Sequence, residues 1–205
     1  MLRLLLVRHG LTGANEEDRY IGASDPPLSD EGLAQAEAVA ARLANERLTA
    51  IYSSPWLRAR QTAEPIARAC GLEVQIEPRL REIDFGCWEG LTQAEIVARF
   101  PEQMQDWNVD PAGEHAPHGG ETLAQVARRA KKVYDKIVAR YGEGEVVLIV
   151  AHGGVLQALL CEALGSPLRA RWPYLLRPAT LSELRVLDGQ PVLVSLNDFR
   201  HLCSG

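Results

Sequence analysis

Apolar residues in this chain gather into short runs and into longer stripes with helical spacing. Short apolar runs bounded by turn residues are typical of buried strands. The runs lie at residues 2–7, 48–54, 72–78 and 146–151. Between them, apolar residues recur every three or four positions, which predicts amphipathic helices. These helices are expected over residues 29–47, 54–71, 92–107, 122–141 and 155–165. Strands that alternate with helices predict an α/β fold with a largely parallel sheet.

The last apolar region has a different pattern. Residues 180–198 form two apolar runs around Asp188-Gly189, a dipeptide that favours a tight hairpin turn. We therefore expect an antiparallel hairpin at one edge of the sheet, with helices on both faces. No internal repeat, low-complexity segment or linker interrupts the pattern, so residues 1–205 are predicted to form a single domain. A small cap, about residues 88–120, is expected over the functional end of the sheet.

Capping residues mark several helix starts. Ser29 is predicted to cap the helix that follows it, and the buried stripe of that helix should include Leu33. Ser54 is predicted to cap the next helix, with Pro55 at its first position. Residues 10–28 are rich in Gly and Pro and are predicted to be irregular. Two capping boxes are also expected, Thr92 with Glu95 and Thr122 with Gln125.

Composition narrows the class of protein. The 205 residues are 46% hydrophobic and 24% charged, as in a typical globular protein. The net charge of −5 and the lack of a long basic run argue against a nucleic-acid partner. The first residues are too briefly apolar for a signal peptide or a membrane span, so we expect a cytoplasmic protein without a membrane partner. The four cysteines have no metal-binding spacing and are expected to be reduced thiols.

Charged and polar residues follow the predicted strands at their carboxyl ends. The first strand ends at Arg8 and His9, and the strand at 146–151 ends at His152. Arg58 lies near the start of the helix after the second strand, and Glu82 follows the third. Open α/β sheets bind ligands at this edge. Two arginines that converge there would repel each other unless an anion lay between them, and Arg binds phosphate oxygens in pairs. The pattern predicts a phosphate pocket.

The familiar phosphate-binding and phosphatase motifs are absent from the sequence. It contains neither G-x-x-x-x-G-K-[ST] nor G-x-G-x-x-G, and no Asp/His cluster of a two-metal phosphatase. No C-x5-R motif makes a cysteine the nucleophile. His9 is the best remaining candidate, because a neutral imidazole can attack phosphorus and carry the phosphoryl group. We therefore expect neither a metal nor any other cofactor.

Alternatives stay open for individual residues. Glu82 could be a surface carboxylate paired with Arg79 or Arg81, and Arg58 could pair with Glu64. Asn15 could serve only as a loop cap. His115 and His118 are expected to be solvated loop residues.

Four blocks of the sequence resemble the histidine phosphatase superfamily, also called the phosphoglycerate mutase-like family. The blocks are LLLVRHG, SSPWLRARQTAE, LREIDFGCWEG and VVLIVAHGG. The resemblance implies a three-layer Rossmann-like sandwich and a phosphohistidine intermediate on His9. It also implies that Arg8, Arg58 and His152 hold the phosphate and that Glu82 gives a proton to the leaving group.

The same resemblance implies further substrate contacts. Asn15, Thr12, Gly153 and Glu121 are the candidates that surround the phosphate site. Relatives often have glutamine where this chain has Ile21, so that phosphate contact is not expected here.

The pattern within the family favours a phosphatase. The stretches RYIGASDPPLSDEG and IDFGCWEG are similar to those of α-ribazole phosphatase and of broad-specificity and phosphoserine phosphatases. The expected partner is a small phosphorylated metabolite, and the chain could form a homodimer. A phosphoglycerate mutase is the alternative, although such mutases tend to be longer and to read like E-R-H-Y-G near Glu82. A non-catalytic sensor is disfavoured because all five core residues are present.

Overall fold

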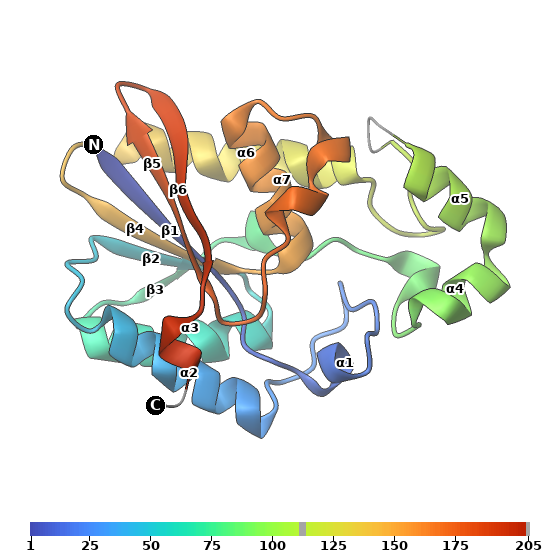
Figure 1. Cartoon of the computed structure of the whole chain (residues 1–205), viewed down its shortest axis with the longest axis horizontal. Coiled ribbons are helices and arrows are strands. Elements are labelled where there is room, and N and C mark those ends of the chain that lie inside the picture. Colours follow the sequence, from blue (N-terminus) through green and yellow to red (C-terminus); the bar gives the residue numbers. More distant parts are fainter. Residues whose placement is uncertain (111–113, 204–205) are drawn as a thin grey trace.

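The computed structural model describes residues 1–110 and 114–203, and within them the strands form a six-stranded sheet (Figure 1). The strand order is β3-β2-β4-β1-β5-β6. The strands are β1 (Leu2–Arg8), β2 (Ala50–Ser53), β3 (Val74–Ile76), β4 (Val146–Ala151), β5 (Leu181–Leu187) and β6 (Gln190–Asp198). The first four run parallel to one another, whereas β5 pairs antiparallel with β1 and with β6. The predicted α/β fold with an antiparallel hairpin at one edge is therefore confirmed.

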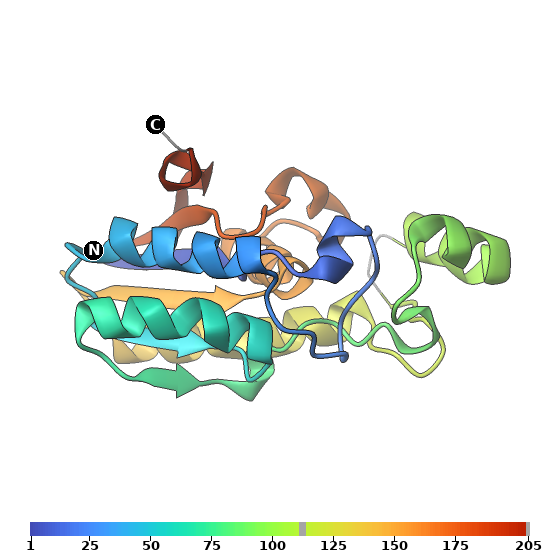
Figure 2. The ribbon, with the colours of Figure 1, turned by 90° about the horizontal axis from the view of Figure 1, so that it is seen from below.

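Helices cover both faces of this sheet, as Figures 1 and 2 show. Helices α2 (Asp30–Leu43) and α3 (Leu57–Cys70) lie on one face, and α6 (Leu123–Arg140) and α7 (Gly153–Leu164) lie on the other. The shorter helices are α1 (Gly13–Glu16), α4 (Gln93–Arg99), α5 (Pro101–Val109), η1 (Pro78–Leu80), η2 (Gly86–Trp88), η3 (Leu168–Ala170), η4 (Trp172–Tyr174) and η5 (Arg200–Leu202). Helices α4 and α5 project beyond the carboxyl ends of the parallel strands (Figure 1).

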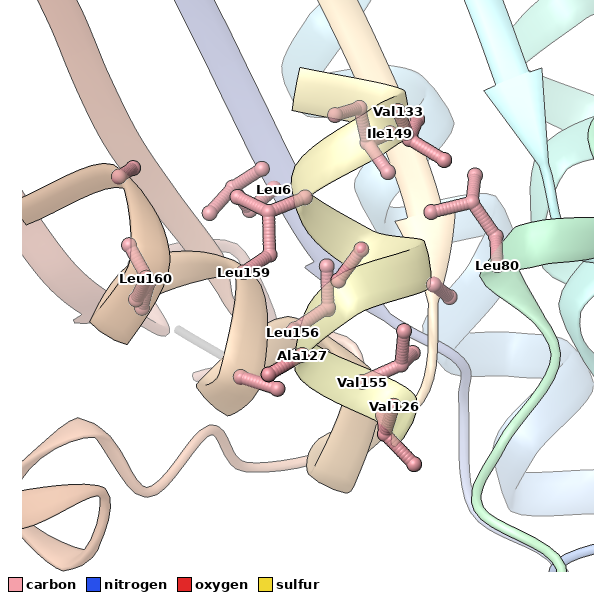
Figure 3. Close-up of a cluster of buried hydrophobic side chains, with 14 of the residues drawn as sticks. Leu6, Leu80, Val126, Ala127, Val133, Ile149, Val155, Leu156, Leu159 and Leu160 are labelled. Carbon is pink, nitrogen blue, oxygen red and sulfur yellow. The ribbon is translucent and has the colours of Figure 1, made fainter. Parts of the chain in front are cut away.

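The alternation of side chains along β1 joins the layers into one structure. Leu4 and Leu6 pack with α6 and α7, whereas Leu5 and Val7 pack with α2 and α3. Figure 3 shows the first of these two cores, where Leu6 and Ile149 of the sheet meet apolar side chains of both helices. Burial of each such side chain stabilises the fold by roughly 1.5–3 kcal/mol. The ends of β1 and β4 are thus held firmly between two cores.

The predicted helix starts at Ser29 and Thr122 are confirmed. The Ser29 hydroxyl accepts a hydrogen bond from the Gly32 amide at 3.2 Å, and Thr122 forms a capping box with Gln125. Leu33, however, is 43% exposed, so its predicted place in the buried stripe is wrong. The first turn of α2 lies directly against the backbone of Leu11, and only a residue without a side chain, Gly32, fits there.

The predicted start of the second helix is wrong by two residues. Helix α3 begins at Leu57, and Trp56 occupies the capping position without a side-chain cap. The Ser54 hydroxyl lies 2.7 Å from Nε2 of His152 and also accepts a hydrogen bond from the amide of Trp56 at 3.3 Å. Ser54 therefore closes the turn that precedes α3 and does not cap the helix itself.

The segment predicted as one helix over residues 92–107 contains two. Thr92 and Glu95 form the expected capping box of α4, but Phe100 leaves the helical conformation with φ −134° and ψ 53°. The residue before a proline is disfavoured in the α region, so Pro101 ends α4 and starts α5. Residues 111–113 of the predicted cap lie outside the described residues.

The loop at residues 10–28 also departs from expectation, because it contains the short helix α1. Thr12 caps this helix in a capping box with Asn15.

All four cysteines are free thiols. None of the helices that the structure describes is both long and apolar enough to cross a membrane.

Candidate active site

His9 stands directly after β1 and is 4% exposed. Its Nδ1 lies 2.7 Å from the carbonyl oxygen of Gly10. A carbonyl only accepts hydrogen bonds, so Nδ1 carries the proton and the lone pair remains on Nε2. Burial lowers the pKa of His9 well below its usual range, and Arg8 and Arg58 lower it further. His9 is therefore a neutral imidazole at pH 7, which is the form that can act as a nucleophile.

His152 occupies the equivalent place after β4, the strand beside β1. The two imidazole rings lie 5.0 Å apart, centre to centre, at 60°. Nε2 of His152 pairs with the Ser54 hydroxyl, and the buried Nδ1 has no hydrogen-bond partner among the described residues. Burial lowers the pKa of His152 well below its usual range, with Arg58 as the next cause. This ring is also neutral at pH 7.

Arg8 is the last residue of β1. Its Nη1 donates to the carbonyl of Leu176 at 2.9 Å, and its buried Nε finds no hydrogen-bond partner in the described part of the chain. Gly153 lies beside this guanidinium, and a Cβ there would make an ordinary van der Waals contact with its carbon at 3.5 Å. Burial lowers the pKa of Arg8, and the nearby Glu82 opposes that shift.

Arg58 lies in the first turn of α3 and is 1% exposed. Its guanidinium donates to the carbonyls of Ser24 at 2.8 Å and Gly22 at 3.2 Å, and Asp25 lies 3.5 Å away. The alternative pairing with Glu64 is wrong. That carboxylate pairs with Arg60, on the outside of the helix.

A single carboxylate holds the loop that anchors Arg58. Glu89 accepts hydrogen bonds from the amides of Gly22 at 3.0 Å and Ala23 at 2.8 Å and from the hydroxyl of Ser24 at 2.9 Å. The loop can therefore present its carbonyl groups toward Arg58, and Glu89 is a supporting residue that the sequence analysis missed.

Glu82 is 8% exposed and reaches the start of α7. One carboxylate oxygen accepts from the amides of Ile83 at 2.9 Å and Val155 at 3.0 Å, and the other accepts from Gly154 at 2.9 Å. The contact requires glycine at 154, because a Cβ there would lie 2.7 Å from the carboxylate. The helix that begins after His152 therefore also fixes Glu82.

The two surface pairings suggested for Glu82 are wrong. Arg79 binds Glu77 at 2.8 Å, and Arg81 binds Glu121 at 2.6 Å.

These side chains open into a cavity of about 450 Å³. Its floor includes Arg8, His9, Arg58 and Glu82. The outer wall is largely apolar and contains Tyr20, Ile21, Phe85, Trp107 and Leu123. Ile21 thus places an apolar side chain where the resemblance suggested a glutamine. A cationic floor below an apolar wall suits an anionic group carried on a small organic molecule.

The structure brings most of the predicted residues to this cavity. Thr12, Asn15 and Gly153 line it together with the floor residues, whereas His152 is fully buried behind His9. Asn15 also caps α1, because its side-chain oxygen accepts from the Thr12 amide at 3.3 Å and hydroxyl at 3.0 Å, so capping and a place in the cavity lining occur together. In the described structure Glu121 does not line the cavity but pairs with Arg129 at 2.9 Å.

Two residues on the outer wall were not predicted. Gln157, on α7, lines the cavity and is 7% exposed, and its amide nitrogen has no hydrogen-bond partner among the residues described. A polar residue inside the apolar run from Val155 to Leu160 was the signal for it. Arg171 lies 5.9 Å from the centre of the Trp107 ring, and nothing in the local sequence marked it.

No group of three His, Cys, Asp or Glu side chains in residues 1–110 and 114–203 is placed to hold a metal ion.

Known proteins are similar to this chain in sequence and in fold. The family model of the histidine phosphatase superfamily, branch 1, matches residues 4–199. Phosphoserine phosphatase 1 of Hydrogenobacter thermophilus is 36% identical over 202 residues, which are 98% of this chain and 95% of that protein. A Yersinia pestis protein named "probable phosphoglycerate mutase" is 38% identical over 188 residues, 90% of this chain and 85% of that protein.

Solved structures of phosphatases are also similar to this fold. A mycobacterial glucosyl-3-phosphoglycerate phosphatase in complex with VO3 superposes with a TM-score of 0.86 at 35% identity, covering 95% of this chain and 98% of that one. The α-ribazole phosphatase of Shigella flexneri gives a TM-score of 0.86 at 28% identity, covering 96% of both chains. The chain therefore belongs to branch 1 of the histidine phosphatase superfamily and is a phosphatase of that superfamily.

Proposed function

We propose that this phosphatase hydrolyses phosphomonoesters of small metabolites through a phosphohistidine on His9, without a metal ion. The observation that carries the proposal is the state of His9. The Gly10 carbonyl accepts a hydrogen bond from its Nδ1, and burial together with Arg8 and Arg58 holds its pKa well below the usual range, so Nε2 keeps the lone pair of the nucleophile.

The floor of the cavity suits phosphoryl transfer. A phosphoryl group in transit spreads negative charge over its equatorial oxygens, so fixed cations supply much of the catalysis. Arg8 and Arg58 are held by backbone carbonyls, and we assign them, with His152, to these oxygens. Asn15 and Thr12 lie at the edge of the same floor and are assigned to substrate binding.

Glu82 is the proposed proton donor and acceptor. In the first step, Nε2 of His9 bonds to phosphorus while the bond to the ester oxygen breaks. The leaving alkoxide is a strong base and takes a proton from Glu82. In the second step, water attacks phosphohistidine and gives its proton to Glu82, which releases inorganic phosphate and restores His9. Glu82 lies on the cavity floor with His9, as both steps require.

The wall supports a small organic substrate. Three of the relatives described above are named phosphoserine phosphatase, glucosyl-3-phosphoglycerate phosphatase and α-ribazole phosphatase. Phe85 and Trp107 line the cavity, and we assign the described residues of the expected cap, 88–110 and 114–120, to a cover over its entrance. These features favour small phosphorylated metabolites over a macromolecule.

A mutase is the second candidate, because one relative carries that name. The test is a parallel assay of phosphate release and of 3-phosphoglycerate isomerisation, with 2,3-bisphosphoglycerate as primer and EDTA present. We expect phosphate release from p-nitrophenyl phosphate and small alkyl phosphates, unaffected by EDTA, and little isomerisation. Isomerisation faster than phosphate release would favour the mutase, and loss of activity in EDTA would contradict the metal-free mechanism.

A further inference from the structure

Glu82 lies in a segment without regular secondary structure, between η1 and η2. We infer that Arg129 and Glu121 form a unit that positions this segment and thereby the Glu82 carboxylate. Arg129 and Glu121 are positioning residues here, since neither lines the cavity that the structure describes. The inference rests on the proposed role of Glu82 as proton donor.

Every nitrogen of the Arg129 guanidinium donates hydrogen bonds to the segment around Glu82 or to Glu121. It lies on α6 and is 8% exposed. Its Nη1 donates to the carbonyls of Arg79 at 2.7 Å and Arg81 at 2.5 Å, and its Nη2 donates to the carbonyl of Glu82 at 3.0 Å. Nη2 and Nε also reach Glu121, at 2.9 and 3.2 Å. Together these contacts use all five N–H groups of the guanidinium.

Glu121 holds the same segment from its other end. Its carboxylate accepts from the amide of Asp84 at 3.2 Å, and its own amide donates to the carbonyl of Asp84 at 2.8 Å. It also accepts from Arg81 at 2.6 Å. The chain is therefore held by hydrogen bonds at Arg79, Arg81, Glu82 and Asp84, on both sides of the proposed proton donor.

The positioning extends to the rest of the site. The backbone of Glu82 is fixed by α6 through Arg129, and its carboxylate is fixed by the first amides of α7. Helix α7 begins directly after His152. Arg129 therefore sets where Glu82 stands relative to the two histidines, at a site where a displacement of about 1 Å can cost about 10²-fold in rate.

The shape of the guanidinium is essential to this role. A lysine keeps the charge but carries a single nitrogen with three N–H groups, so it cannot reach three carbonyls and both oxygens of Glu121. Arg129→Lys should leave the phosphate-binding arginines in place while loosening Glu82. Arg128, the neighbouring residue, has a 64% exposed side chain and only a distant contact with Glu114 at 3.9 Å, so Arg128→Lys is the matched control.

The test compares two substrates in two backgrounds. We expect Arg129→Lys to lower kcat on β-glycerophosphate, an alkyl phosphate, by about 10- to 100-fold with little change in KM. The loss on p-nitrophenyl phosphate should be much smaller, because its phenolate leaves without a proton. In a Glu82→Gln background, Arg129→Lys should cause little further loss of kcat, because both substitutions remove the same function, proton donation by Glu82. Arg128→Lys should match the wild type.

Several outcomes overturn the inference. Equal losses on the two substrates, or a full additional loss in the Glu82→Gln background, would make Arg129 a merely structural residue. Should Arg129→Lys fail to fold by circular dichroism, Glu121→Gln provides the second variant and must show the same leaving-group dependence. If Glu82→Gln is selective and neither variant is, the inference fails and the proposed function stands. If Glu82→Gln itself is unselective, the proposed role of Glu82 fails, and the inference fails with it.

Discussion

At the scale of single residues, the site combines buried cations with imidazoles that stay neutral. Burial and the two arginines both disfavour a proton on His9, and they act in the same direction on His152. The same environment that attracts a phosphate therefore keeps the nucleophile in its reactive form. A histidine with an ordinary pKa of about 6.5 would be partly protonated at neutral pH.

This burial has a consequence for stability. Below pH 6.5 the unfolded chain protonates His9, whereas the folded chain, with its lowered pKa, does not. The free energy of unfolding is therefore highest above pH 6.5 and falls as the pH drops below it, by up to about 1.4 kcal/mol per pH unit for this residue. In His9→Asn the free energy of unfolding should fall less steeply below pH 6.5, by up to about 1.4 kcal/mol per pH unit. Urea unfolding at pH 7 and pH 5, in phosphate-free buffer, measures this, and parallel declines in the two proteins would refute it.

The role of Glu82 predicts a dependence on the leaving group. Glu82→Gln removes the proton that is donated while keeping the size of the side chain. The rate should therefore fall most for a substrate with a poor leaving group. We expect a loss of about 10²–10⁴-fold in kcat on β-glycerophosphate and a far smaller loss on p-nitrophenyl phosphate. Steady-state kinetics on the two substrates provides the comparison. An equal loss on both would assign Glu82 to binding or structure.

At the scale of elements, irregular segments are held in place by single carboxylates. Glu89 orders the loop at residues 22–24, which in turn binds Arg58. Glu89→Gln places an amide against donor groups and should loosen the loop, with a loss of about tenfold in kcat/KM on both substrates. Glu102→Gln, on the exposed surface of α5, is the control and should have no effect. Unchanged kinetics for Glu89→Gln would show that Arg58 does not depend on this loop.

The elements also show where sequence reasoning reaches its limit. Strands and long helices are predictable because their apolar periodicity is local, and the capping box of Thr122 is equally local. The start of α3 was misplaced because the Ser54 hydroxyl binds the amide of Trp56 in a turn before the helix, and its other partner, His152, is remote in sequence. Arg129 could have been suspected, since it interrupts the apolar stripe between Val126 and Val133, but its acceptors are backbone carbonyls that no sequence pattern reveals.

At the scale of the whole molecule, topology assembles the site. Strands β1 and β4 are neighbours in register, with Arg8 opposite Ala151, so His9 and His152 emerge side by side. The sequence predicted this meeting because both histidines follow strands of one parallel sheet. Arg58 could be assigned to the same edge for the same reason. Most of the outer wall could not be predicted, because Phe85, Trp107 and Arg171 come from distant segments that meet only in the folded chain.

The central claim is that His9 carries the phosphoryl group. The most direct measurement is rapid acid-free quenching of the enzyme during turnover of ³²P-labelled substrate, followed by identification of the labelled residue. We predict phosphate on His9, in a linkage that is stable in base and labile in acid, and no label in His9→Ala. A label on a cysteine or serine, or turnover retained by folded His9→Ala, would contradict the mechanism.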